Sequence, residues 1–372
     1  PDEMAPNNAL REKTEDERER IDDKAINESW GVISKEEVAA RGTGVSNPVD
    51  DFNKAPHSEL RAFYTGLMFV TRLPCPGWCD HHPGYLMRSM AWFPALGLIV
   101  GAWCAAFADA TALVLSPTVA AAVSTGASLW LTGCFHEDGL GDTMDGFGGG
   151  WTKNQIMRIM KDSRTGTYGC MGLALYTITK VALLGELGRS EWVLGASAGQ
   201  GPAMVVAHTV ARATSAPLIY LNKYVLDDDD AKGEYYNWFG RSRDLLSTRR
   251  VVFSFACAAA VTAAFVGATA RAAGIGAVLL LAIFFAGRYG TAIIGGVMGD
   301  FLGATICLTE LAIYATLAAD FSRAEALVAR DGTARALAPV AVLAVAIAAP
   351  FVWTRHANAA STSTSEEEKK EC

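Results

Sequence analysis

Apolar segments long enough to cross a lipid bilayer recur along this chain, and they constrain its fold more than any other feature. About eight of them alternate with polar stretches, and 51% of the residues are hydrophobic while only 19% are charged. Lipid offers the backbone no hydrogen-bonding partner, so apolar runs of this length cross a bilayer as helices. We therefore expect an all-α, multi-pass integral membrane protein embedded in a lipid bilayer. The expected spans are 90–115, 117–135, 170–188, 203–221, 251–270, 275–294, 302–319 and 337–353.

Polar tails flank the apolar region. Residues 1–57 are dense in charge and predict a disordered or loosely helical tail, and residues 356–372 predict a second polar tail. The intervening residues 58–355 form the expected membrane-embedded domain. Within it, Phe63–Val70 is apolar but too short to span, so we expect this segment to lie at the interface or to re-enter the membrane.

Positive charges are distributed unevenly among the loops. With eight spans, loops 136–169, 222–250 and 295–301 and both tails share one side, and the first two of these loops are rich in Lys and Arg. The opposite loops hold fewer, apart from 320–336. This bias predicts that the first group faces the cytoplasm or its organellar equivalent. No basic stripe is visible and the net charge is −7, so no nucleic acid is expected as a partner.

The cysteines predict no disulfide framework. Most of the eight stand singly in apolar runs, where cysteine behaves as a small hydrophobic residue. One local Cys/His cluster has a spacing that matches no standard zinc pattern, so a metal is not expected there. Its members are Cys75, Cys79, His81 and His82.

Four carboxylates follow the second span within nine residues. Asp138, Asp142 and Asp145 stand at i, i+4 and i+7, so a helix places them in one stripe, and Glu137 lies beside them. Like charges at that spacing repel, which makes the stripe costly unless a cation binds it. Mg²⁺ held for a phosphate-bearing substrate is the expected cation. A solvated helix end is the alternative, but the glycines that follow, which let a ligand approach closely, favour a site.

A second polar segment suits an anion. Lys161, Ser163, Arg164 and Gly166 lie just before the span 170–188, and a guanidinium such as that of Arg164 can hold two phosphate oxygens at once. Arg72 is another candidate anion contact. The alternative interpretation is an ordinary positive loop next to a membrane.

Ionisable residues also occur within the spans or at their ends. Asp300 precedes a span that carries Glu310, and His208 and Arg212 lie at i and i+4 in another. Such residues usually face a cavity or a partner, and Glu310 is the candidate partner of the His208/Arg212 pair. A helix cap at Asp300 and a purely structural polar pair are the alternatives.

Together these motifs resemble one known family. Phe135-His136-x-Asp138-Gly139-Leu140-x-Asp142-Thr143-x-Asp145-Gly146 resembles the signature of the cobalamin synthase family, the adenosylcobinamide-GDP ribazoletransferases. Segments 160–169, 71–74, 93–97 and 295–310 are similar to its other blocks, and all stand in the family's order between about residues 63 and 319. Glu137 departs from the pattern, in which an apolar residue is expected.

The resemblance implies a Mg²⁺-dependent transferase of the phosphotransferase type, with 58–355 as its catalytic domain. The implied reaction is the last assembly step of a vitamin B12-type cofactor (cobalamin), and its substrates are adenosylcobinamide-GDP and α-ribazole or its 5′-phosphate. The ribazole hydroxyl attacks the cobinamide-side phosphorus, and GMP leaves. A homo-oligomer stays open as a further partner.

Residue roles follow from what a diphosphate substrate needs: a cation, an arginine or lysine on the leaving group, and a base or orienting group near the hydroxyl. The catalytic candidates are His136, Asp138, Asp142, Asp145 and Asp162. The substrate-binding candidates are Arg72, Lys161, Ser163, Arg164, Gly166, Asp300, Glu310 and Arg212. The candidate metal ligands are Asp138, Asp142, Asp145 and Glu137.

Three alternatives remain at this stage. A CDP-alcohol phosphotransferase would share Asp142-x-x-Asp145-Gly146, but the rest of its motif does not follow. A membrane prenyltransferase would also use Asp-rich loops with Mg²⁺, but would need two of them at similar positions in a repeat. An ion-coupled transporter would place its acids near the middle of broken helices, whereas this cluster stands at the end of a span.

Overall fold

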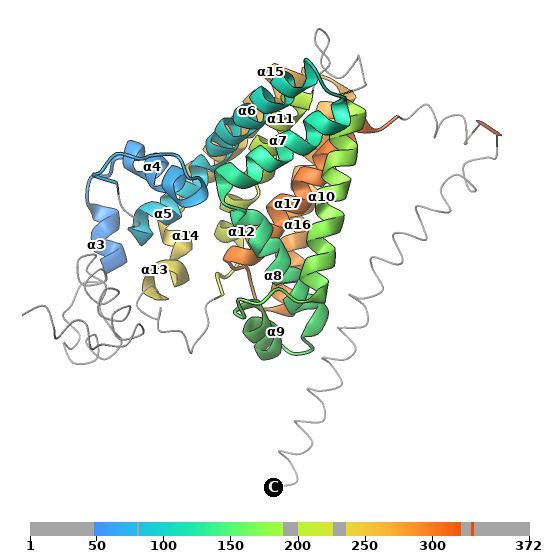
Figure 1. The fold of residues 1–372 in the computed structure, drawn as a ribbon. Coiled ribbons are helices and arrows are strands. Elements are labelled where there is room, and N and C mark those ends of the chain that lie inside the picture. Colours follow the sequence, from blue (N-terminus) through green and yellow to red (C-terminus); the bar gives the residue numbers. More distant parts are fainter. Residues whose placement is uncertain (1–47, 80–81, 189–199, 226–235, 321–328, 331–372) are drawn as a thin grey trace, which may run out of the picture. The chain divides into compact units, whose positions relative to one another are not determined.

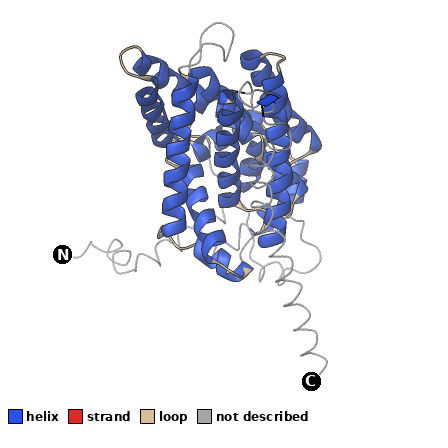
Figure 2. Cartoon of the chain, turned by 90° about the vertical axis from the view of Figure 1, so that its right-hand side faces the viewer, coloured by secondary structure: helices blue, strands red, loops and turns tan. Residues whose placement is uncertain are grey.

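The computed structural model describes residues 48–79, 82–188, 200–225, 236–320 and 329–330. The chain divides into two compact units, Pro1–Leu317 and Ala318–Cys372, and everything below concerns the first. Figure 2 shows that its described regular elements are helices. The only β pairing among the described residues is an isolated parallel bridge between Tyr224 and Val297. The expected tails and the expected span 337–353 lie almost wholly outside the described residues.

The all-α fold class expected from the apolar segments is confirmed. The helices are α3 (Pro48–Lys54), α4 (Glu59–Val70), α5 (Pro83–Ser89), the 3₁₀ helix η1 (Met90–Trp92), α6 (Phe93–Ala112), α7 (Pro117–Thr132), α8 (Phe135–Gly149), α9 (Lys153–Met160), α10 (Thr167–Leu187), α11 (Gln200–Arg212), α12 (Ser215–Leu221), α13 (Tyr236–Gly240), α14 (Ser242–Leu245), α15 (Thr248–Val266), α16 (Ala270–Ile293) and α17 (Gly299–Ala318).

Hydroxyl side chains and prolines mark where several of these helices begin. The Ser116 hydroxyl accepts from the backbone N–H of Val119 at the start of α7, and Pro117 occupies the first turn, where its missing N–H costs nothing. Thr152 and Gln155 cap α9 reciprocally, each side chain accepting from the other's backbone N–H. These local contacts set helix ends that the apolar periodicity alone leaves undefined.

Five helical stretches of the described chain are long and apolar enough to cross a membrane: Pro83–Ala112, α10, α15, α16 and α17. The pair α7 and α8, bent by 91°, makes a sixth if counted as one broken span. The expected count of eight is therefore not confirmed. In particular, the expected span 203–221 is not continuous, because α11 ends at Arg212 and α12 begins at Ser215. The short segment 63–70 lies in α4, whose 12 residues are too few to span.

Small residues let the central helices approach closely. Gly101 of α6 faces the backbone of Val205 in α11, and a Cβ on Gly101 would lie only 2.7 Å from the Val205 Cα. Gly97, one turn earlier, faces the backbone of His208. Such small-residue contacts are the usual device for packing membrane helices. The ribbon places α8 beside α10 and α17, so that the acidic helix lies against two of the candidate spans (Figure 1).

Candidate active site

The acidic cluster lies on α8, which begins at a sharp turn. Gly133 and Cys134 precede it with φ values of 63° and 61°, both in the left-handed region. Glycine adopts this conformation freely, whereas Cys134 does so at a cost that its surroundings must offset. The double turn redirects the chain by 91° from the axis of α7. As a result, the acids run alongside α10 and α17 instead of continuing the apolar helix.

Asp138, Asp142 and Asp145 grade from exposed through half-buried to buried along α8. The charges that act on the Asp142 carboxylate come from Asp138, Asp300 and Asp145, and all of them are negative. Neither Asp138 nor Asp142 forms an ion pair with a residue that the structure describes. Repulsion between Asp138 and Asp142 is therefore not offset by an ion pair to either of them from the described residues, which favours cation binding.

Asp300 joins the stripe from the N-terminus of α17. Gly139 of α8 packs directly on its backbone: a Cβ at that position would lie 2.7 Å from the Asp300 carbonyl oxygen and 2.8 Å from its Cα. Gly303, one turn further along α17, is also close to α8, since a Cβ there would lie 3.1 Å from the carbonyl oxygen of His136. Glycine at these contacts lets the two helices bring acids that are 158 residues apart, Asp142 and Asp300, to one place.

Asp145 has a distinct role, because it holds the start of α10. Its two carboxylate oxygens accept hydrogen bonds from the backbone N–H groups of Gly166, at 2.6 Å, and Gly169, at 2.8 Å. A carboxylate at a helix N-terminus satisfies N–H groups that lack intrahelical partners and interacts favourably with the helix dipole. Asp145 thus fixes the segment 161–166 next to the acidic stripe.

In that segment, Arg164 is already paired. Its guanidinium donates to both carboxylate oxygens of Asp162, Nε to Oδ1 at 2.9 Å and Nη2 to Oδ2 at 2.6 Å, while 87% of the Arg164 side chain is exposed. These hydrogen bonds lower the pKa of Asp162 to about 2. A carboxylate with so low a pKa is a poor proton acceptor at neutral pH. Lys161 and Ser163 are exposed beside the pair.

Arg72 lies at the turn that begins α8. Its backbone N–H donates to the carbonyl of Leu131 at 2.8 Å, which fixes the segment 71–74 against the end of α7. The guanidinium packs over Gly133, where a Cβ would lie 3.1 Å from Arg72 Nε. A positive group therefore stands at one end of the acidic helix.

A closed network of charged groups lies on the other side of α8. The Arg212 guanidinium contacts Nδ1 of His136 at 3.3 Å and Nδ1 of His208 at 3.0 Å. Arginine can only donate, so Nδ1 of His136 must accept, and the proton of a neutral His136 ring is then on Nε2. His136 Nε2 is buried and has no hydrogen-bond partner among the described residues.

Glu310 completes the network from α17. Its carboxylate pairs with Lys180 Nζ of α10 at 2.7 Å, lies 3.5 Å from His208 Nδ1 and accepts from the Tyr314 hydroxyl at 3.0 Å. All these side chains are buried. The proximity of His208 and Arg212 to Glu310 is the arrangement expected from their positions within apolar segments. Glu137 is also buried here, within the fields of Lys180 and Glu310, and so lies off the acidic stripe.

Lys180 was not among the residues that the sequence singled out. It is the one basic residue of the apolar segment 170–188, and a basic side chain within such a segment is itself a signal for a buried partner. The sequence could not name the partner, because Glu310 is 130 positions away. Only the packing of α10 against α17 joins the two.

The residues present suit a divalent cation, although they do not form a complete cage. Among the described residues, no three His, Cys, Asp or Glu side chains are placed to hold a metal ion together. Mg²⁺ commonly keeps several waters and uses only one or two carboxylates together with substrate phosphates. Asp138 and Asp142, which carry no described ion pair, fit that mode.

The Cys/His cluster has a structural explanation for its described members. Cys75 and Cys79 are free thiols. His82 caps α5, with its Nδ1 accepting from the backbone N–H of Gly84 at 3.1 Å, and its ring stacks on Phe52 at 5.0 Å. His81 lies outside the described residues.

Comparisons with known proteins point to one family. Residues 62–318 match the family model described as cobalamin-5-phosphate synthase. An adenosylcobinamide-GDP ribazoletransferase of Shewanella oneidensis is 35% identical over 261 residues, covering 70% of this chain and 95% of that protein. One from Shewanella sp. (strain ANA-3) is 42% identical over 178 residues, covering 48% of this chain and 66%, just under two thirds, of its own length. No solved structure matches the chain significantly.

Proposed function

The chain belongs to the cobalamin-5-phosphate synthase family, and we propose that it joins adenosylcobinamide-GDP to α-ribazole, or to its 5′-phosphate, with release of GMP. The observation that carries this proposal is the acidic face formed by Asp138, Asp142 and Asp300. Asp138 and Asp142, which form no ion pair with a described residue, lie beside a loop held by Asp145, and this arrangement suits a Mg²⁺-bound diphosphate. The matched family and its motif order favour this reaction over the CDP-alcohol, prenyl and transporter alternatives.

In this reaction the ribazole hydroxyl attacks the phosphorus on the cobinamide side of the diphosphate, and the bond from that phosphorus to the GMP oxygen breaks. The hydroxyl proton goes to a base or to solvent, and GMP takes the released charge. Asp138 and Asp142 would hold Mg²⁺, which would supply neutralisation of the charge on the phosphate oxygens. Catalysis of phosphoryl transfer depends largely on positioning the reacting groups. The hydrogen bonds that Asp145 accepts from Gly166 and Gly169 hold the loop before α10 in place, and in this way they contribute to the positioning of the substrate.

The basic residues near the acidic face differ in how they can contact a phosphate. Arg72 and Lys161 are exposed and can reach phosphate oxygens. Arg164 can do so only by sharing or releasing Asp162. His136 is held by Arg212 as a donor at Nε2, so it orients a substrate oxygen and does not take its proton.

We also propose that this face lies on the cytoplasmic side of the membrane or its organellar equivalent. The acidic helix, the loop at 161–166 and the start of α17 meet at one end of the helix bundle, and the loops at this end are rich in Lys and Arg. Labelling of single cysteines placed at positions 141 and 299 in sealed vesicles would test it. Labelling from opposite sides would contradict the shared face.

The deciding experiment incubates the purified full-length chain with adenosylcobinamide-GDP, α-ribazole and Mg²⁺. We expect GMP release matched by cobalamin formation, detected by mass. Excess EDTA should abolish both, and added Mg²⁺ should restore them. Full turnover in EDTA would remove the metal from the proposal, and absence of GMP release with both acceptor forms would overturn the function.

A further inference from the structure

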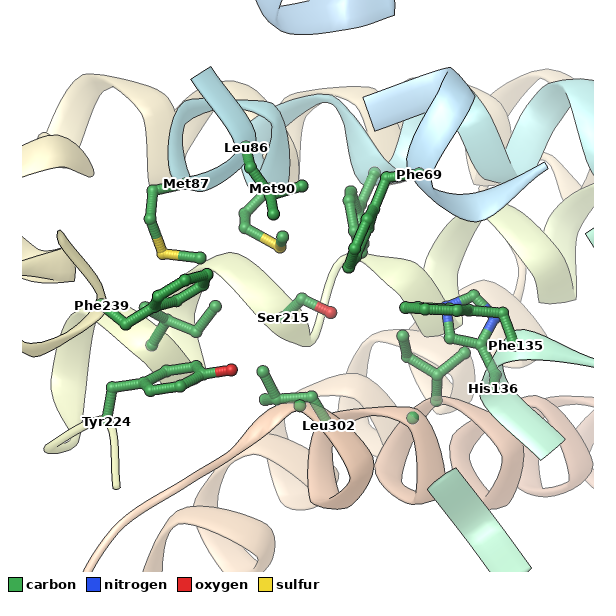
Figure 3. Close-up of a pocket in the computed structure, with 15 residues that line it drawn as sticks. Phe69, Leu86, Met87, Met90, Phe135, His136, Ser215, Tyr224, Phe239 and Leu302 are labelled. Atoms are coloured by element: carbon green, nitrogen blue, oxygen red, sulfur yellow. The ribbon is translucent and has the colours of Figure 1, made fainter. Parts of the chain in front are cut away.

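An apolar pocket, part of it open to the surface, lies between α4, α5, α12 and the start of α17, and His136 is among the residues that line it. Figure 3 shows Phe69, Met87 and Met90 on one side of the space and Leu302 and Tyr224 on the other. Side chains from seven α-helices, the 3₁₀ helix η1 and the loop at Tyr224 therefore enclose one hydrophobic space.

Only three polar side chains line this pocket, and two of them have unused hydrogen-bonding capacity. The Ser215 hydroxyl projects into the space in Figure 3, and it is buried without a partner among the described residues. His136 also lines the pocket, and its Nε2 is likewise unpartnered. The Tyr224 hydroxyl reaches the N-terminus of α17 beside Gly299. Buried polar atoms left without partners carry a penalty that a ligand can remove.

We propose that this pocket binds the base of the acceptor nucleoside, a planar and largely apolar bicyclic ring, and this assignment rests on the proposed function. Aromatic and methionine side chains suit the faces of such a ring. Ser215, Tyr224 and His136 Nε2–H then bond the few polar atoms of the base and its ribose. Gly299 lines the pocket and directly precedes Asp300 of the acidic face, so a ribose at that end of the pocket lies near the acids.

Two other occupants fit the lining less well. Guanine, from the nucleotide-activated substrate, has several hydrogen-bond donors and acceptors on its edge. The residues that line the pocket are mostly apolar and would leave these groups unpaired. A lipid acyl chain would fill the apolar space but leave Ser215 and His136 without partners. The acceptor base is the ligand that uses both features of the pocket.

The test compares two variants with the wild-type full-length chain. Ile219→Phe places a larger side chain in the pocket, and Ser215→Ala removes one hydroxyl with little change of volume. We expect Ile219→Phe to raise the KM for α-ribazole by about tenfold or more and Ser215→Ala by about fivefold, with the KM for adenosylcobinamide-GDP unchanged. Val252→Phe, at an exposed position of α15 outside the pocket, is the control.

Equilibrium dialysis of α-ribazole against each variant, without the second substrate, separates this proposal from the proposed function. If the wild type binds α-ribazole and Ile219→Phe does not, the pocket assignment stands even where no GMP is released. A rise confined to the KM for adenosylcobinamide-GDP would assign the pocket to guanine. Unchanged KM values in both variants, with lipid lost from purified Ile219→Phe, would assign it to an acyl chain. Either result overturns the proposal.

Discussion

The two sides of α8 differ in how their charged side chains are surrounded. On one side, Asp138 and Asp142 are at least partly exposed, and the charges acting on Asp142 are all negative. On the other, His136 joins a buried network in which acids and bases pair at close range. Charged side chains that pair with one another inside the protein mainly determine how the helices pack. Charged side chains that have no such partner are candidates for binding a ligand of opposite charge. The comparison separates residues that hold the site from residues that act in it.

Glycines at the contact between α8 and α17 explain how one short helix can contribute to both sides. Gly139 and Gly303 bring α8 and α17 into backbone contact, and this places Asp300 on the acidic side while Glu310 enters the network. A larger residue at Gly139 would push α8 and α17 apart, and this would disturb the acidic side and the buried network together. The same helix pair therefore couples the stability of the buried side to the geometry of the open side.

The largest expected effect is on the buried side. Lys180→Met removes one partner of a fully buried ion pair and leaves Glu310 without its nearest positive charge. We expect a loss of about 3–5 kcal/mol of unfolding free energy, measured by denaturation in detergent. Lys54→Met, which breaks an exposed pair with Asp51, is the matched control and should cost about 0–1 kcal/mol. Equal stability of the two variants would show that the network contributes no specific pairing.

On the open side, Asp142→Asn should act on turnover and not on stability. We expect GMP release to fall by about 100-fold or more, because a charge that stabilises the reacting phosphates is lost. The unfolding midpoint should stay or rise slightly, since repulsion within the stripe is relieved. Asp109→Asn, on α6 near the start of α11, is a control carboxylate remote from the stripe. Near wild-type rates would remove Asp142 from the site.

The family and the all-helical fold could be predicted from the sequence, and both are confirmed. Apolar length determines spans reliably, because each must satisfy its own backbone in lipid. The error at 203–221 has a visible cause. Pro217 stands in the first turn of α12, where it has no N–H to donate and would clash with the carbonyl of residue 213 in a continuous helix. Proline within an apolar run was the missed signal.

The site was predicted in part. Spacing alone placed Asp138, Asp142 and Asp145 on one stripe, since that follows from helical geometry. It could not show that Asp145 is engaged by the N-terminus of α10, or that Glu137 faces Lys180. Those facts depend on how helices distant in sequence pack, and no local pattern encodes them. The apolar pocket was missed for the same reason.

Asp145→Asn tests whether this acid positions or binds the metal. An amide has one oxygen acceptor, so one of the two hydrogen bonds to Gly166 and Gly169 should be lost. We expect a stability loss of about 0.5–2 kcal/mol, as for other lost helix caps. The Mg²⁺ concentration that gives half-maximal activity should be unchanged, whereas Asp138→Asn should raise it. A raised Mg²⁺ requirement in Asp145→Asn would make Asp145 a ligand as well.

The smallest effect is expected in the loop between the two sides, at Arg164. Lys at this position keeps the charge but loses the fork that holds Asp162 or two phosphate oxygens. Because the side chain is 87% exposed, solvent weakens the interaction, and we expect the KM for adenosylcobinamide-GDP to rise only about fivefold. The KM for α-ribazole should not change. A shift confined to α-ribazole would place Arg164 at the acceptor.

The variant Asp162→Asn tests whether Asp162 acts as a base or only pairs with Arg164 before the substrate binds. With its pKa at about 2, Asp162 is ionised throughout the neutral range, so its removal should not alter the pH profile between about pH 6 and 8. If Asp162 only occupies the guanidinium before substrate arrives, its loss frees Arg164 and the KM for adenosylcobinamide-GDP should fall or stay constant. A large drop in kcat with the acidic arm of the pH profile lost would instead identify Asp162 as the base. Arg164 would then belong to the catalytic machinery through its control of that carboxylate.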